Sequence, residues 1–325
     1  MSTIVFLVIT VLVIVAMVQM VSIYDLSNVI KGRNSYEVSD ATNKTQGFLF
    51  LCFVIVYLLS FFWQIAKWGK FTLPEAASEH GQEIDSLMML TLVIISIVFF
   101  VTHIFLGWFA FKYAGSKDKK ALYYPHNDKF ELISTSSVAL GLTIIILYGL
   151  TVWNHVMKPL PAEADKEIIE IYAKQFDWTA RYAGKDKRLG RANVYLIEGA
   201  NALGVDSTDV NAHDDIIVKS EFYIPVGKPV EFRFRSQDVI HSAYMPHFRA
   251  QMNCVPGMVT TFHFTPKYTT EEMREKTANP QFDYILLCNK ICGAAHYNMQ
   301  MTIKVVTMEE YEKWLASQNQ FMASK

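Results

Sequence analysis

The chain has 325 residues, of which 51% are hydrophobic and 19% are charged, so it is long enough to divide itself between lipid and water. Its 30 lysines and arginines balance 31 aspartates and glutamates to a net charge of −1, and such a chain has no field that attracts a polyanion. Nucleic acid is therefore excluded as an expected partner. The four cysteines are too few for a disulfide scaffold of this length.

Four segments are long and apolar enough to cross a membrane. A hydrocarbon core of about 30 Å needs roughly 20 apolar residues in a helix, because only a helix satisfies its own backbone groups in lipid. The segments carry no lysine, arginine, aspartate or glutamate in their interiors, and they cover residues 4–24, 48–65, 87–111 and 133–153. No basic residue precedes the first segment and no Ala-x-Ala-like cleavage site closes it, so we interpret it as a retained span and not as a signal peptide.

Basic residues are densest in the third connecting loop, which contains Lys117, Lys119, Lys120 and Lys129. Cytoplasmic loops are enriched in lysine and arginine, so this loop is expected on the cytoplasmic side and everything after the fourth span on the outer face. The sequence thus predicts three parts. Residues 1–80 form an N-terminal region with two transmembrane helices, residues 81–158 a transmembrane hairpin, and residues 159–325 an extracytoplasmic domain.

Short strand-like runs follow one another in the outer domain. They cover residues 170–173, 216–224, 229–236, 259–265 and 284–287, and Gly227 and Lys228 form the turn between the second and the third. Many short strands without intervening helices indicate a sandwich or a Greek-key barrel. Residues 188–215 are rich in Asn, Asp and Gly, which predicts a surface excursion. Thr307 and Glu310 form a capping box that predicts a C-terminal helix.

The residues most informative about chemistry lie near the C-terminus. Two thiols, an imidazole and a thioether fall within twelve residues, as Cys288, Cys292, His296 and Met299. Soft sulfur ligands with imidazole select copper, zinc or iron–sulfur chemistry, and a thioether favours copper. A mononuclear blue-copper site uses one cysteine, so the second cysteine favours two copper ions bridged by two thiolates.

A dinuclear site needs a second histidine, which the fold must bring from elsewhere in the sequence. His241 is the best candidate, since it lies just past the strand-like run 229–236. His213 and His247 are the other possibilities in the outer domain, and each is more typical of a surface or hydrogen-bonded histidine.

Two simpler interpretations of the cysteine pair remain open. A disulfide between residues four apart requires a sharp turn, and it would give His296 and Met299 no role. A structural zinc site normally takes four Cys or His ligands and rarely a thioether.

These residues resemble subunit II of the haem-copper respiratory oxidases. The similarity extends from about Ile84 to the C-terminus. Besides the copper motif, it includes four segments in the family's order: residues 126–131 (His-Asn-Asp-Lys-Phe-Glu), 175–178 (Gln-Phe-Asp-Trp), 238–241 (Asp-Val-Ile-His) and 255–257 (Val-Pro-Gly).

The resemblance implies that an all-β, cupredoxin-like Greek-key barrel follows the four predicted transmembrane helices and precedes the predicted C-terminal helix. It also implies an electron-entry subunit of cytochrome c oxidase in the bacterial inner membrane, with a dinuclear copper centre, CuA, on the periplasmic face. Electrons from cytochrome c, or from a cytochrome c domain of another complex, would pass to haem in subunit I for oxygen reduction and proton pumping. Subunits I and III and membrane lipid are the expected partners. No Cys-x-x-Cys-His occurs, so we expect no haem in this chain.

The same resemblance assigns roles to individual residues. Copper would be bound by five side chains and one backbone carbonyl, those of His241, Cys288, Cys292, His296 and Met299 and the carbonyl of Lys290. Glu131 falls where the family has a glutamate at the cytoplasmic entrance of a proton pathway.

Three features depart from the family pattern, two of them single residues and the third the number of spans. Position 290 is usually a glutamate that also reaches a magnesium ion, so Lys290 puts a magnesium site in doubt. Phe176 replaces the tryptophan at which electrons enter, and Trp178 is the alternative entry residue or a core residue. The family commonly has two spans, and the extra two would bind a neighbouring subunit or lie against lipid.

Two other functions share parts of this pattern. A quinol oxidase subunit II has the same architecture without copper, but retention of all five side-chain ligands argues against it. A membrane-tethered copper carrier would need an open and exchangeable site, whereas this motif has the full set for a closed dinuclear centre.

Overall fold

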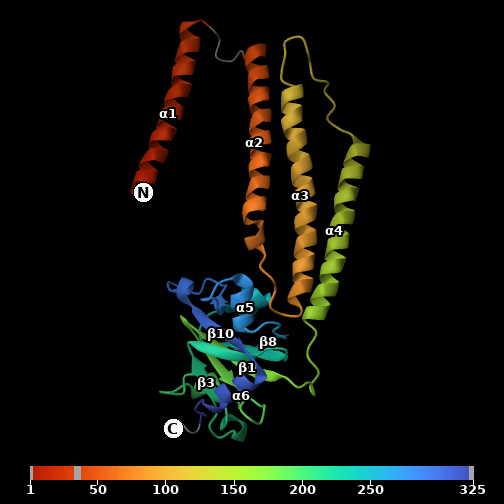
Figure 1. Ribbon diagram of the computed structural model, residues 1–325. Helices are drawn as coiled ribbons and strands as arrows, with labels where there is room; N and C mark the ends of the chain where they lie inside the picture. The colour runs from red at the N-terminus through yellow and green to blue at the C-terminus, as the bar shows by residue number, and fades with distance from the viewer. Residues whose placement is uncertain (1–2, 33–37, 322–325) are drawn as a thin grey trace. The chain divides into compact units, whose positions relative to one another are not determined.

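The computed structural model describes residues 3–32 and 38–321 (Figure 1). Its first half consists of four long helices, α1 (Thr3–Ile30), α2 (Asp40–Thr72), α3 (Gly81–Lys112) and α4 (Asp128–Val156). By length and composition each is able to cross a membrane, with mean hydropathies from 1.9 to 2.6. The four predicted spans are confirmed as helices, and α2, α3 and α4 extend past their apolar segments at both ends.

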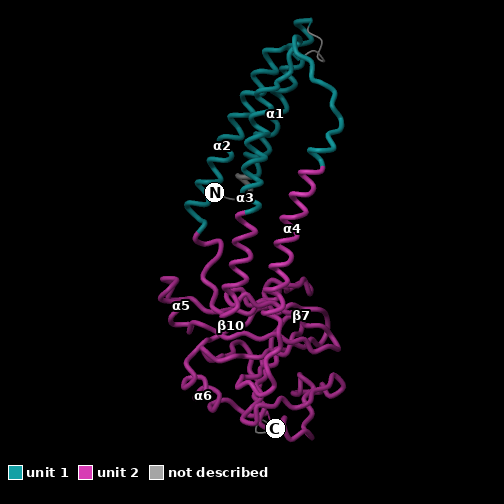
Figure 2. Tube along the Cα trace, turned by 90° about the vertical axis from the view of Figure 1, so that its right-hand side faces the viewer, with its two compact units in different colours: residues 1–69, 94–131 teal, residues 70–93, 132–325 magenta. Residues whose placement is uncertain are grey.

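The chain forms two compact units, residues 1–69 with 94–131 and residues 70–93 with 132–325 (Figure 2). Within the first unit, α2 and α3 approach closely at small residues. A Cβ added to Gly107 would lie 3.2 Å from the Cβ of Val54, and one added to Gly47 would lie 2.8 Å from the carbonyl oxygen of Ala110. Small residues at such positions let helix backbones pack in lipid, where no hydrophobic effect drives them together.

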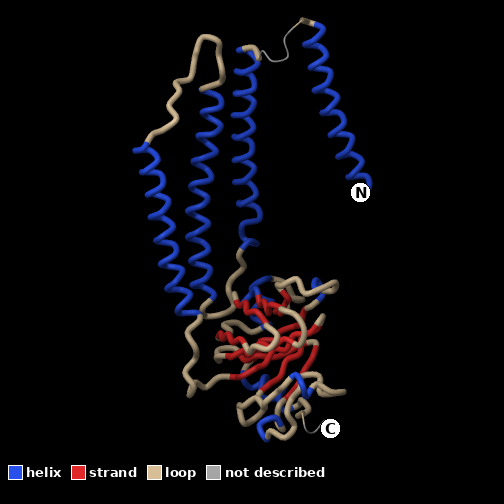
Figure 3. Tube along the Cα trace, turned by 180° about the vertical axis from the view of Figure 1, so that it is seen from behind, coloured by secondary structure: helices blue, strands red, loops and turns tan. Residues whose placement is uncertain are grey.

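The outer domain of the second unit is a sandwich of two five-stranded sheets, and Figure 3 shows its strands in red. The first sheet has the order β3-β2-β1-β5-β8, with β3 (Ile216–Lys219), β2 (Asp177–Tyr182), β1 (Glu167–Lys174), β5 (Val230–Ser236) and β8 (Thr260–Phe264). The second has the order β4-β10-β9-β6-β7, with β4 (Glu221–Pro225), β10 (Gln300–Val306), β9 (Tyr284–Cys288), β6 (His241–Met245) and β7 (Ala250–Cys254). The predicted all-β architecture is confirmed.

The predicted single strand 216–224 is wrong, because it is two strands that belong to different sheets. Ser220 separates them with a φ of 72°, which turns the chain between β3 and β4. β3 then pairs with β2, whereas β4 pairs in parallel with β10. The apolar alternation of this run continues across Ser220 because both strands face the same core.

Two helices complete the outer domain. α5 (Thr270–Thr277) was not predicted. The predicted C-terminal helix is confirmed as α6 (Met308–Ala316), and the capping box of Thr307 with Glu310 is formed. α6 packs against both sheets. The Trp314 ring stacks on Tyr223 of β4 at 4.3 Å and lies edge-on to Tyr182 of β2 at 5.4 Å.

The predicted surface excursion, residues 188–215, is only partly on the surface. Leu203, Val205 and Ala212 are buried against Tyr172 in a small cluster of their own. Asp215 and Arg181 form a fully buried ion pair, with Nη1 of Arg181 3.0 Å from Oδ2 of Asp215. The polar composition of this segment therefore partly reflects buried hydrogen bonds and not exposure alone.

Arg181 is the centre of a buried polar network. Its Nη2 and Nε donate to Glu170 at 2.9 and 3.2 Å, and its Nη1 also donates to the carbonyl oxygen of Gly190 at 2.9 Å. Arg235 adds a second cation on Glu170 at 3.2 Å. Burial raises the pKa of Asp215 from its ordinary 3.8 to about 7, and its Oδ1 has no hydrogen-bond partner among the described residues.

This raised pKa predicts a pH dependence of stability. Between pH 3.8 and about 7 the folded chain retains a proton on Asp215 that the unfolded chain releases, so this group's contribution to stability falls as pH rises through that window. We expect Asp215→Asn to remove that part of the slope, measured as the difference in Tm between pH 5 and pH 8. Asp206→Asn is the control, because hydrogen bonds from Thr208 lower the pKa of Asp206 and place its titration below the window. An unchanged slope in Asp215→Asn would contradict the assignment.

The pairing between β6 and β9 is the shortest in its sheet. It consists of two register pairs, Ala243 with Cys288 and Tyr244 with Leu287. By contrast, β6 pairs with β7 over five residues and β10 with β9 over four. One further backbone bond, from Asn289 N–H to the carbonyl oxygen of Ser242 at 2.9 Å, extends this junction.

Candidate metal centre

The predicted ligands come from two neighbouring strands of the second sheet. Cys288 is the last residue of β9, and the loop that follows it carries Cys292, His296 and Met299 before β10 begins. His241 is the first residue of β6, the strand beside β9. The position of His241 after β5 was predicted correctly. The strand β6, which brings the His241 imidazole to the cysteines, was not predicted.

Sulfur and nitrogen atoms converge on the two thiols. The Sγ atoms of Cys288 and Cys292 lie 3.9 Å apart, and both cysteines are free thiols. Nδ1 of His241 lies 3.8 Å from Sγ of Cys288, and Nδ1 of His296 lies 3.6 Å from Sγ of Cys292. Sδ of Met299 lies 3.9 Å from Sγ of Cys292. Each thiol thus has one imidazole nitrogen beside it.

The backbone carbonyl of Lys290 also faces the thiols. Its oxygen lies 3.2 Å from Sγ of Cys288, while the lysine side chain is exposed. A carbonyl is available from any residue type, so the lysine does not disturb this part of the ligand set. All six predicted donor groups are therefore brought together.

His241 is held in a defined orientation. Its Nε2 lies 2.8 Å from Oδ1 of Asp238, so the other ring nitrogen, Nδ1, faces Cys288. Burial alone would raise the pKa of Asp238, but the Gln175 backbone N–H and the His241 ring outweigh it and hold that pKa below its ordinary value. A carboxylate on the outer nitrogen fixes the tautomer and increases the basicity of the nitrogen that binds a metal.

The thiols are suited to metal binding rather than to free reactivity. Burial, and next the neighbouring Cys288 thiol, raises the pKa of the Cys292 thiol to about 11. A metal ion that binds there must displace the proton, as soft metals do from buried thiols. Two thiols, two imidazoles, a thioether and a carbonyl together fit copper better than zinc. Free thiols 3.9 Å apart also argue against the disulfide interpretation.

The alternative histidines are placed elsewhere. His213 contacts the carbonyl oxygen of Ser207 through Nε2 at 3.1 Å, and His247 packs against the rings of Phe282 and Tyr284. Among the described residues, His241, Cys288 and Cys292 form a group that could hold a metal ion, since their ligand atoms lie within 4.8 Å of one another. Cys254 is buried opposite His241 in the β6–β7 ladder, and burial raises its pKa to about 12.

The aromatic candidates for electron entry occupy different environments. Trp178 is fully buried, its Nε1 donates to the carbonyl oxygen of Met299 at 3.3 Å, and its ring lies edge-on to His241 at 6.1 Å. Phe176 is half-buried and packs against Gly293 of the ligand loop. No role of its own was predicted for Gln175, although it contacts both Asp238, beside His241, and Cys292.

Glu131 belongs to the other compact unit. It lies in the first turn of α4, where its Oε1 accepts from the backbone N–H of Asn127 at 3.4 Å. Asn127 caps the same helix through its side chain, which accepts from Phe130 N–H at 3.0 Å.

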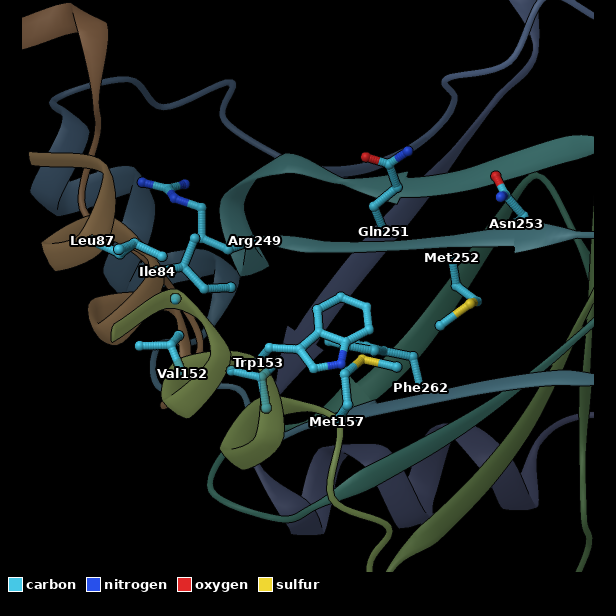
Figure 4. Close-up of a pocket in the computed structure, with 12 residues that line it drawn as sticks. Ile84, Leu87, Val152, Trp153, Met157, Arg249, Gln251, Met252, Asn253 and Phe262 are labelled. Atoms are coloured by element: carbon cyan, nitrogen blue, oxygen red, sulfur yellow. The ribbon is translucent and has the colours of Figure 1, made fainter. Parts of the chain in front are cut away.

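A cavity of about 480 Å³ lies away from these ligands (Figure 4). Its walls come from the start of α3, the end of α4 and the strands β7 and β8, and Trp153, Arg249 and Phe262 are among its lining residues. Arg249 is neutralised by Asp85 at 2.7 Å. No predicted copper ligand lines this cavity.

Comparisons with known proteins identify the family of this chain. The family model described as cytochrome C oxidase subunit II, periplasmic domain, matches residues 168–306, and the one for its transmembrane domain matches residues 66–152. An alternative cytochrome c oxidase subunit 2 from Bradyrhizobium diazoefficiens is 35% identical over 239 residues, which cover 73% of this chain and 81% of the relative. The chain belongs to the cytochrome c oxidase subunit II family. The predicted resemblance is thereby confirmed.

Two further similar proteins have lower sequence identity. Cytochrome c oxidase subunit 2 of Thermostichus vulcanus is 28% identical over 293 residues, covering 83% of this chain and 84% of the relative. Among solved structures, the periplasmic domain of subunit II of the Bradyrhizobium japonicum cytochrome oxidase has 23% identity and a TM-score of 0.33. It covers 49% of this chain and 96% of that domain. Family membership and the four apolar helices make this chain a membrane protein and a member of the oxidase complex.

Proposed function

We propose that this subunit II accepts electrons from a cytochrome c at a dinuclear copper centre, CuA, and passes them to haem in subunit I for oxygen reduction coupled to proton pumping. One observation carries the proposal: the two thiols lie 3.9 Å apart, and four further donor groups, from His241, Lys290, His296 and Met299, each lie 3.2–3.9 Å from one of them. When bound, copper supplies the one-electron redox change.

The residues of the chain supply the fixed geometry. Cys288 and His241 are anchored on adjacent strands, and Asp238 orients the His241 ring. Burial of Cys292 and Met299 excludes water from the inner side of the site. A rigid, dry site changes little when an electron arrives, which keeps the reorganisation cost of transfer small.

The direct test is to measure copper content and the electron paramagnetic resonance spectrum of the purified full chain. Two copper ions per chain with one electron delocalised over both are expected. One exchangeable copper ion would favour the carrier, and no copper would favour the quinol oxidase. Either outcome would overturn the proposal.

Phe176 is proposed as the residue through which electrons enter. It is half-buried against the ligand loop, whereas Trp178 is fully buried and is the less accessible candidate. We expect Phe176→Ala to slow electron entry from cytochrome c by about tenfold, as loss of a group supporting a metal site does, without changing copper content. Stopped-flow reduction measures this rate. The control is Tyr195→Ala, which removes an aromatic side chain that is 91% exposed; equal rates in the two variants would exclude Phe176.

The remaining roles follow from family membership and the basic-loop pattern. We propose that the chain lies in the bacterial inner membrane with the copper domain on the periplasmic side. Subunits I and III are its proposed partners, and Glu131 is proposed to receive protons at the cytoplasmic entrance of a pathway into subunit I. Three lysines lie between α3 and α4 and a fourth, Lys129, lies in the first turn of α4, which supports the cytoplasmic placement of Glu131.

A further inference from the structure

Gln175 contacts both segments that carry the copper ligands. It directly follows β1, a strand of the first sheet, whereas the ligands belong to β6, β9 and their loops in the second sheet. We propose that Gln175 is a positioning residue that clamps the two ligand segments in a single geometry. This inference rests on the proposed copper function and deepens it.

The first half of the clamp reaches the His241 segment. The backbone N–H of Gln175 donates to Oδ2 of Asp238 at 2.7 Å. The other oxygen of this carboxylate accepts from Val239 N–H at 2.7 Å and lies 2.8 Å from Nε2 of His241. One carboxylate therefore joins the Gln175 backbone to a copper-facing imidazole.

The second half of the clamp reaches the cysteine loop. Nε2 of Gln175 donates to the backbone carbonyl oxygen of Cys292, across 117 positions of sequence. The next residue, Gly293, lies directly against the clamp. A Cβ added there would lie 2.9 Å from Nε2 of Gln175 and 2.8 Å from Cζ of Phe176. A larger residue at 293 would therefore move either the loop or the Gln175 side chain, and the φ of 143° at this position adds backbone strain.

A link between these two segments matters because the backbone ladder between their strands is short. The strands β6 and β9 share two register pairs, so the ladder alone defines their separation weakly. Gln175 adds a connection beyond the end of that ladder, on the side where the ligands lie. The side chain also has to be long and to end in a donor. Glutamate would place an acceptor against the Cys292 carbonyl, and methionine has similar length without the donor.

The experiment uses the copper-loaded full chain with Gln175→Met, and Gln318→Met as the matched control. Gln318 also donates from Nε2 to a backbone carbonyl, that of Trp314, but lies after α6. A hydrogen bond contributes about 1 kcal/mol, which corresponds to a roughly fivefold to tenfold change in an equilibrium or rate. We expect copper transfer to a chelator to be faster by about that factor in Gln175→Met, with altered copper hyperfine splitting and an unchanged Tm of the metal-free chain.

Gly293→Ala provides a second test that leaves the glutamine intact. It should change copper release and hyperfine splitting in the same direction, because its Cβ and the backbone strain at a φ of 143° together disturb the contact between the loop and Gln175. If Gln175→Met lowers the Tm of the metal-free chain, the copper measurements on Gly293→Ala test the clamp in its place. If both variants match Gln318→Met in release and spectrum, the clamp is wrong. Absence of delocalised copper in the unmodified chain would instead overturn the proposed function itself.

Discussion

Replacing Cys288 by serine is expected to abolish the delocalised copper pair. The Cys288 thiol is the group that faces His241, the Lys290 carbonyl and Cys292 at once, so its loss removes the bridge between the two halves of the ligand set. A hydroxyl is a hard donor that does not replace a thiolate for copper. Copper content should fall from two ions per chain to one or none. The effect should exceed the about 10- to 100-fold loss that follows removal of a group that only supports a ligand.

The measurement is copper content together with electron paramagnetic resonance of the purified full chain. The control is Cys52→Ser, because Cys52 lies in α2 and belongs to the other compact unit. It should retain two coppers and the delocalised signal. A delocalised pair in Cys288→Ser would refute the assignment of the ligands.

At pH 8, where Asp215 is ionised, replacing Arg181 by methionine is expected to destabilise the outer domain by about 3 to 5 kcal/mol, the usual cost of leaving buried charges without their partner. The Arg181 side chain is 2% exposed and donates to Glu170, Asp215 and the Gly190 carbonyl. Methionine fills much of the same volume, but it leaves Asp215 without its cation and Glu170 with Arg235 alone. The substitution should also loosen the segment 188–215, because Arg181 of β2 holds it through hydrogen bonds to the Gly190 carbonyl and Asp215.

Urea unfolding of the full chain in detergent, followed by near-ultraviolet circular dichroism, measures this loss. Arg188→Met is the matched control, because Arg188 is exposed, and it should change the free energy of unfolding by less than about 0.5 kcal/mol. Equal stability of the two variants would mean that the buried network contributes no net stability.

Features carried by local sequence were predictable. Apolar segments of the right length predicted the four helices, and the Thr307 capping box predicted α6, because both depend on residues close together in the chain. The candidate ligands from Cys288 to Met299 were predicted for the same reason. His241 required a further argument, namely that a second imidazole was missing from the set.

Features that depend on distant contacts were not predictable from pattern. Ser220 gives no sign that its φ is positive, since that conformation is imposed by pairing of its two flanking strands with different sheets. Arg181 and Asp215 are charged residues that sequence statistics place on the surface, and only their mutual contact allows them to be buried. Gln175 acts through a carbonyl 117 positions away, which no spacing within one segment encodes.

The short junction between β6 and β9 has a consequence for how the subunit matures. The two strands carry His241 and Cys288, so a metal ion bound to both would cross-link the place where the sheet is least secured by backbone hydrogen bonds. A chain awaiting its metal would then open locally at this junction more readily than the metal-bound chain.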